Sequence, residues 1–154
     1  MALRFLHGAT NMSIEITRRN ISESELDRLR KGFEEYALEH GVPPLAQIRY
    51  GVVAMDGDGF VGCASGLADR RWFFLSDLWV EKEYRGHGTG TKLLQQMETK
   101  VLELGVDRIY TWTAGFEAPA FYAKNAYEVF GELENYYPTG HSRIGLRKTL
   151  GKTI

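Results

Sequence analysis

The sequence predicts a single α/β domain, on two observations. Segments in which every second residue is apolar, as in strands, alternate along the chain with segments whose apolar residues recur at helical spacing. The length of 154 residues, with 44% hydrophobic and 25% charged residues, is typical of one globular domain. We expect one domain at residues 12–150, preceded at residues 1–11 by an N-terminal extension or the remnant of an expression tag, with Met12 as an alternative start.

The first elements are predicted from a weak alternation and a helix-capping pattern. Residues 13–18 alternate weakly and predict a strand. Ser22 with Glu25 three residues later forms a capping box, and Gly41 is a typical stop, so we expect a helix over residues 23–40. The apolar residues at helical spacing in this segment are Leu26, Leu29, Phe33 and Tyr36. Residues 42–47 fit either a loop or a short second helix.

Strand signals dominate the middle and the end of the chain. Asp-Gly at residues 56 and 57 accepts the positive φ of a hairpin turn, so residues 48–55 and 60–67 predict a hairpin. After the glycine loop described below, a helix with one apolar face runs to Gly105. The face consists of Leu94, Met97, Val101 and Leu104. The remaining expected elements are strands at 72–80, 108–113, 127–133 and 143–150, and a helix at 119–124.

Composition excludes several classes of protein. The formal net charge of −1 removes the broad electrostatic argument for nucleic-acid binding. The chain holds one cysteine, Cys63, so an internal disulfide is impossible; a reducing, cytoplasmic location is expected, with this side chain in the core. No apolar run approaches the ~20 residues of a membrane span, and the start lacks a signal peptide, so we expect no membrane association.

A glycine-rich loop lies between a predicted strand and a predicted helix, in the run Arg85-Gly86-His87-Gly88-Thr89-Gly90. Glycines let backbone N–H groups converge, and a helix N-terminus adds free N–H donors and a positive dipole end. We therefore expect a phosphate or pyrophosphate site. A Walker loop fails on spacing, because Lys92 follows Thr91 and not glycine. A dinucleotide fingerprint lacks its third glycine and its later acidic residue.

The loop resembles the coenzyme A loop of the GNAT superfamily of acyl-CoA-dependent N-acetyltransferases, in Arg85, Gly88 and Gly90 after a strand that ends in Leu-Trp-Val. A second block, residues 118–129, resembles the superfamily's C-terminal motif. The resemblance covers about residues 14–150. It implies an acyl-CoA N-acyltransferase fold, with a central mixed, mostly antiparallel sheet flanked by helices, and acetyl-CoA as cosubstrate.

The resemblance also implies which residues bind the cofactor: Leu78, Trp79, Val80, Arg85, Gly86, His87, Gly88, Thr89, Gly90, Thr91, Phe121, Tyr122 and Lys124. Two positions depart from the superfamily pattern. Gly115 stands where an asparagine is often seen, and Ala126 replaces a glycine, so we expect Asn125 to take the left-handed cap.

The implied chemistry is direct attack of a primary amine on a thioester, with Tyr122 as general acid and backbone N–H groups near residues 78–80 facing the oxyanion. The base stays open between Asp77 and Glu117, while His87 and His141 are better explained by cofactor or surface contacts. No His, Cys and carboxylate cluster has metal-ligand spacing, so no metal is expected.

Two rival functions remain. A catalytically silent acyl-CoA sensor would need the loop but not Tyr122, and a structural subunit would need neither. The apolar strand at residues 72–80 suits the core or the interface of a homodimer. The acceptor, a small-molecule or peptide amine, is not specified by the sequence.

Overall fold

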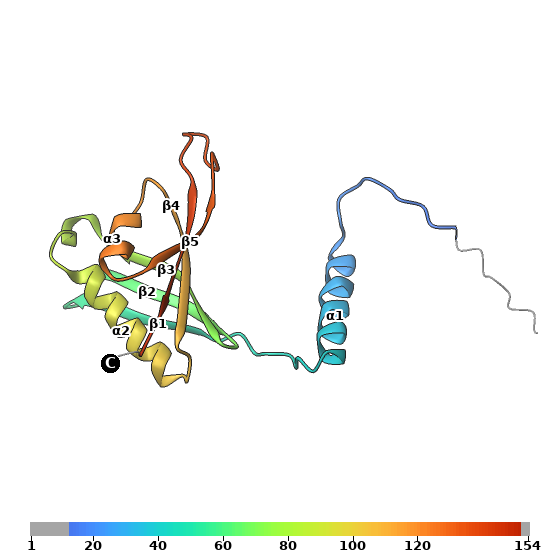
Figure 1. Ribbon diagram of the computed structural model, residues 1–154, viewed down its shortest axis with the longest axis horizontal. Helices are drawn as coiled ribbons and strands as arrows, with labels where there is room; N and C mark the ends of the chain where they lie inside the picture. The colour runs from blue at the N-terminus through green and yellow to red at the C-terminus, as the bar shows by residue number, and fades with distance from the viewer. Residues whose placement is uncertain (1–12, 152–154) are drawn as a thin grey trace, which may run out of the picture. The chain divides into compact units, whose positions relative to one another are not determined.

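The computed structural model describes residues 13–151, which divide into two compact units at Pro44 and Leu45 (Figure 1). The expected extension at residues 1–11 lies outside the described residues.

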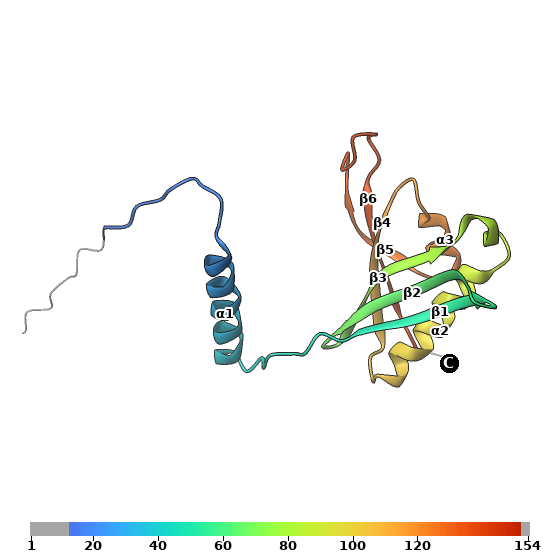
Figure 2. The ribbon, with the colours of Figure 1, turned by 180° about the vertical axis from the view of Figure 1, so that it is seen from behind.

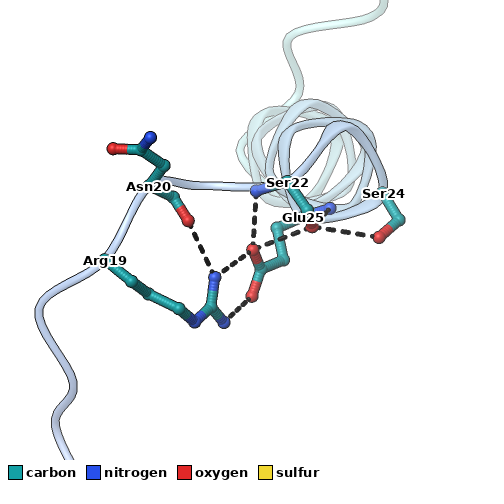
Figure 3. A network of polar contacts seen from close by, with 5 residues as sticks. All are labelled: Arg19, Asn20, Ser22, Ser24 and Glu25. Carbon is teal, nitrogen blue, oxygen red and sulfur yellow. Dashed lines mark hydrogen bonds and ion pairs between the residues drawn. The ribbon is translucent and has the colours of Figure 1, made fainter.

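The first unit is built around helix α1, Glu23–Glu39, which begins at the predicted capping box. The Ser22 backbone N–H donates to Glu25 at 2.8 Å, and the Glu25 N–H donates back to the Ser22 hydroxyl (Figure 3). The guanidinium of Arg19 donates to the same carboxylate, which lowers the pKa of Glu25 to about 2. Gly41 ends the helix with a φ of 74°. The predicted helix is thus confirmed, to within one residue.

Two features of this unit differ from the expectation. Residues 13–18 form no strand, because a strand is held by ladder hydrogen bonds and the described part of this unit offers no partner strand. Residues 42–47 form no second helix. Helix α1 buries none of its residues, and Phe33 on its apolar face is 66% exposed.

The second unit is a six-stranded sheet with helices, as predicted (Figure 2). The strand order is β1-β2-β3-β4-β6-β5, and every neighbouring pair is antiparallel except β3 and β4. The strands are β1 Arg49–Asp56, β2 Gly59–Asp69, β3 Trp72–Val80, β4 Arg108–Ala114, β5 Glu128–Leu133 and β6 Arg143–Thr149. The helices are η1 Lys82–Tyr84, α2 Thr89–Glu103 and α3 Pro119–Lys124.

The core lies between the sheet and α2. Leu94, Met97 and Val101 of α2 are fully buried, which confirms the predicted apolar face. They pack in one cluster with buried residues of β3 and β4, including Phe73 and Ile109. Burying such side chains contributes about 1.5–3 kcal/mol each, so this layer holds β3 and β4 in fixed positions.

Strand β3 carries two irregularities next to each other. Ser65 of β2 pairs with Asp77 and Gly66 pairs with Leu75, so Ser76 is an extra residue, a β-bulge. On the other side, the ladder between β3 and β4 is limited to two residue pairs, at Phe73 and Phe74. The two strands therefore separate beyond this point, and their C-terminal ends border a gap in the sheet.

Two further expectations were wrong. Cys63 is half-buried and stands outside the core cluster, because its neighbour Ala64 takes the inward position on β2. The left-handed residue after α3 is Ala126, with a φ of 65°, and not Asn125, whose φ is −95°. The Tyr127 N–H bonds back to the Tyr122 carbonyl, and this closure fixes the left-handed turn at residue 126.

Candidate active site

The glycine loop ends in a helix N-terminus without a side-chain cap. Gly88 is the N-cap residue, with a φ of 81°, and Gly86 has a φ of 78°. Non-glycine residues seldom adopt these angles, which explains the glycines. The first helical hydrogen bond runs from the Lys92 N–H to the Gly88 carbonyl at 3.1 Å. The N–H groups of residues 89–91 precede this bond, so they have no partner within α2.

These N–H groups open onto a cavity of about 340 Å³, here called the loop cavity. Its wall includes Gly86, Gly88 and the first turn of α2, and it continues along Leu78 and Val80 of β3. Free N–H donors and the positive end of the helix dipole suit an anion. The residues present therefore fit a phosphate or pyrophosphate group.

Arg85 borders the same cavity and is held in place by two contacts. Its Nε donates to the Val80 carbonyl at 2.9 Å, and its guanidinium lies 4.7 Å from the ring centroid of Trp79. The indole N–H of Trp79 donates to Glu81 at 3.2 Å. The permanent positive charge of Arg85 is thus fixed at the end of β3.

A second cavity, of about 630 Å³, lies in the gap between β3 and β4 and is here called the gap cavity. It shares Leu78, Val80, Arg85, Ala118 and Phe121 with the loop cavity, so the two cavities adjoin each other and are together called the hollow. The residues that line only the gap cavity are Ser76, Asp77, Trp79, Thr111, Trp112, Thr113, Phe116, Glu117 and Tyr122. We call this set the acceptor end.

The backbone of β3 presents polar groups to this hollow. The Glu81 N–H bonds to the Val61 carbonyl of β2 at 2.7 Å. Antiparallel ladders alternate, so the N–H groups of Leu78 and Val80 point the other way, toward β4. The ladder to β4 is limited to Phe73 and Phe74, so these two N–H groups face the gap.

Tyr122 of α3 closes the inner wall of the gap cavity. Its side chain is 6% exposed and packs edge-to-face against Phe121 and Tyr127. Burial raises the pKa of Tyr122 to about 12, and the charge of Glu117 acts in the same direction, whereas a hydrogen bond with Thr111 acts against it. Tyr122 therefore keeps its proton at neutral pH and is a hydrogen-bond donor.

Two carboxylates line the acceptor end, and each is anchored through one oxygen. Asp77 Oδ2 accepts from the hydroxyls of Ser65 and Ser76, both at 2.6 Å, and from Arg49 at 3.0 Å. The hydroxyl hydrogen bonds, Ser65 first, lower the pKa of Asp77. Asp77 thus binds two hydroxyls and a guanidinium.

Glu117 precedes α3 and is anchored to the end of β4. Its Oε2 accepts from the Thr113 hydroxyl at 2.8 Å and from the Ala114 N–H at 3.0 Å. Within residues 13–151, no ion pair involves Glu117. Both carboxylates therefore keep one oxygen, Oδ1 and Oε1 respectively, outside these anchoring bonds.

The structure gathers most of the residues predicted from the sequence around this hollow. Of the thirteen, only His87 and Lys124 line neither cavity. His141 also lies outside, with its ring 5.3 Å from that of Phe116. Gly115 donates to the Ser142 carbonyl at 2.8 Å, and an added Cβ would lie 3.3 Å from that oxygen, which explains a small residue there.

Sequence reasoning missed the contribution of β4, namely Thr111, Trp112 and Thr113, and that of Phe116. A usable signal existed, because parallel neighbouring strands end at the same edge of a sheet, and β3 and β4 were both expected as strands. Residues 13–151 hold no group of three His, Cys, Asp or Glu side chains placed to bind a metal ion. In the same part of the chain, none of the helices has the length and apolarity needed to cross a membrane.

Comparisons with known proteins show the family of this sequence. The sequence model of the acetyltransferase (GNAT) family matches residues 15–131. Blasticidin-S acetyltransferase of Streptomyces morookaense is 31% identical over 77 residues, which cover 47% of this chain and 54% of that protein. The match thus spans about half the length of this relative.

Solved structures share the fold. A crystal structure of an acetyltransferase from Bacillus cereus has a TM-score of 0.77 at 24% identity, covering 88% of this chain and 98% of that one. The aminoglycoside 6′-N-acetyltransferase of Enterococcus faecium has a TM-score of 0.61 at 23% identity, covering 69% and 75%. The chain thus has the fold of these acetyltransferases, with a mixed sheet. The chain belongs to the GNAT family of acetyltransferases.

Proposed function

We propose that this protein transfers the acetyl group of acetyl-CoA to a primary amine by direct attack. One observation carries the proposal: the cavity at the uncapped N-terminus of α2 adjoins a second cavity that Tyr122 lines. A long cosubstrate with an anionic middle and a reactive thioester end suits such a path. The thioester supplies the activated acyl group.

The loop cavity would hold the pyrophosphate. The free N–H groups of residues 89–91 and the guanidinium of Arg85 are the donors in reach of this cavity. The N–H groups of Leu78 and Val80 would bind the amide-rich arm and the carbonyl oxygen of the thioester. The cosubstrate would thus lie in the gap between β3 and β4 and pair with β3 as a neighbouring strand would.

Tyr122 would assist the departing sulfur. A thiol has a pKa of about 8.5, well below the pKa of about 12 that burial gives Tyr122. Complete proton transfer to the sulfur would therefore be uphill. A hydrogen bond from the hydroxyl to the sulfur, strengthening as the C–S bond breaks, is the better-matched role.

The acceptor amine would attack in its neutral form from the open side of the gap cavity. Asp77 is a poor proton acceptor, because hydrogen bonds from two serine hydroxyls lower its pKa. Water or Glu117 would therefore take the amine proton. The names of the relatives support a small-molecule acceptor, since they specify blasticidin S and an aminoglycoside.

The test has two stages. Coenzyme A should first raise the melting temperature, because a ligand that binds only the folded state stabilises it. Acetyl-CoA and a panel of amines should then release free thiol at a rate above the amine-free background. Stabilisation without thiol release from any amine would favour the acyl-CoA sensor instead. Absence of stabilisation would contradict both functions.

A further inference from the structure

The acceptor end of the gap cavity has an unbalanced charge. The charged residues of its lining are Asp77 and Glu117, and the one cation among the described residues that border the cavity, Arg85, lies at the end shared with the loop cavity. Asp77 is already paired with Arg49 at 3.0 Å. Within the described part of the chain, the partners of Glu117 are neutral, so its charge is the uncompensated one.

Glu117 is also held in place by the protein. The bonds from Thr113 and Ala114 fix Oε2 and leave Oε1 outside them. The anchoring groups belong to β4, which the core holds in position, so the carboxylate does not depend on a free loop. Its charge reaches Tyr122 at the inner wall.

Aromatic side chains complete this end of the cavity. Trp112 and Phe116 lie on the same lining as Glu117. Trp79, on the β3 side, already has the guanidinium of Arg85 4.7 Å from its ring centroid. The ring of Phe116 is held edge-on by Tyr137 at 5.2 Å. Aromatic faces next to a carboxylate attract ammonium and guanidinium groups and do not attract anions.

We propose that the acceptor is an amine with a second group that is cationic at neutral pH, which Glu117 binds while the neutral amine faces Tyr122. This inference rests on the proposed acetyl transfer and names the acceptor class for it. One nitrogen must be neutral to attack, so the preference for one acceptor over another comes from the other nitrogen. An acceptor whose second group is a carboxylate is repelled at the same position.

The experiment compares three acceptors of equal chain length: a straight-chain diamine, the matching monoamine, and the matching ω-amino acid. We expect kcat/KM for the diamine to exceed that for the monoamine on the order of 10-fold after correction for its two equivalent amines, with the amino acid lowest. In Glu117→Gln the ratio of kcat/KM for the diamine to kcat/KM for the monoamine should fall toward unity, while the affinity for coenzyme A stays unchanged.

The matched control is Glu132→Gln, which removes the same charge from an exposed carboxylate of β5 outside the lining. It should keep the wild-type preference. Equal kcat/KM for diamine and monoamine in the wild type, or a preference that survives Glu117→Gln, would overturn the inference while leaving acetyl transfer intact.

A binding measurement separates this inference from the proposed reaction. Calorimetric titration of the diamine into the protein saturated with coenzyme A requires no turnover. Tighter binding to the wild type than to Glu117→Gln supports the cation site. Equal binding overturns it. Failure of every amine to release thiol would contradict the reaction, and the titration would still decide on the cation site.

Discussion

The loop end and the acceptor end of the hollow are built from different parts of the protein. The loop end is made of backbone: N–H groups of one short segment, held by glycines at residues 86 and 88 with positive φ. The acceptor end is made of side chains from β3, β4 and the segment before α3. A backbone site binds what all members of a family share, whereas a side-chain site can change one residue at a time. We therefore expect cofactor binding and acceptor choice to be separable by mutation.

The largest effect should come from the loop end. Gly88→Glu places a negative charge against the proposed pyrophosphate and strains a backbone with a φ of 81°. We expect the affinity for coenzyme A to fall on the order of 10²-fold or more, as measured by titration of the folded variant. Gly88→Gln, with equal bulk and no charge, should lose less. Unchanged affinity in a folded Gly88→Glu protein would remove the loop from the site.

The acceptor end should respond in the opposite manner. Tyr122→Phe keeps the ring and its edge-to-face contacts, so the affinity for coenzyme A should change little. The turnover number should fall on the order of 10²-fold, because the hydrogen bond to the sulfur forms mainly in the transition state. Tyr127→Phe is the control: its hydroxyl is bonded to Glu98 at 3.1 Å and lies outside both cavities. Normal turnover in Tyr122→Phe would assign Tyr122 to packing.

The free energy of unfolding at high pH should show whether Tyr122 keeps its proton in the folded state. Its pKa is about 12 in the folded state and about 10 in the unfolded chain. The unfolded state therefore loses this proton first, and stability should decline as pH rises from about 10 toward 12, by up to about 2 kcal/mol. In Tyr122→Phe the decline between pH 9 and 11.5 should be shallower, as followed by chemical denaturation. The exposed Tyr136→Phe should match the wild type.

The smallest effect concerns the end of α3, the helix that carries Tyr122. Ala126 has a φ of 65°, which disfavours any residue with a Cβ. Ala126→Gly should therefore raise the free energy of unfolding by about 0.5–1 kcal/mol, after allowing for the greater flexibility of glycine in the unfolded chain. Ala123→Gly, within the same helix, should lower it by about 1 kcal/mol. Equal losses from both would contradict the strain at residue 126.

The same contrast between the two ends explains how much could be predicted from the sequence. The loop end was predicted in detail, because its glycines, its helix start and Arg85 are contiguous. Helix α2 and the strand pattern followed from periodicity and turn residues, with ends correct to about two residues. These are local signals, and they carry over to the folded structure.

The acceptor end was not predicted to the same extent, because it depends on which distant segments meet. Thr111 and Trp112 reach the cavity since β3 and β4 separate after two paired residues. The anchoring of Glu117 by the end of β4 likewise depends on a turn at residues 114–117. The strand expected at residues 13–18 does not form for a related reason. An alternating sequence favours an extended backbone, but a strand also needs a partner strand for its hydrogen bonds.

The extra residue at Ser76 determines which face of β3 each later side chain occupies. Side chains alternate along a strand, yet Phe73 and Leu75 before the bulge and Leu78 and Val80 after it all pack toward the core. Before the extra residue the odd-numbered residues of β3 face the core, and after it the even-numbered residues do. Without a bulge, a strand of the same length would place Asp77 and the following tryptophan on the core side and turn two apolar residues outward. The bulge therefore lets one strand keep its apolar residues in the core on both sides of Ser76.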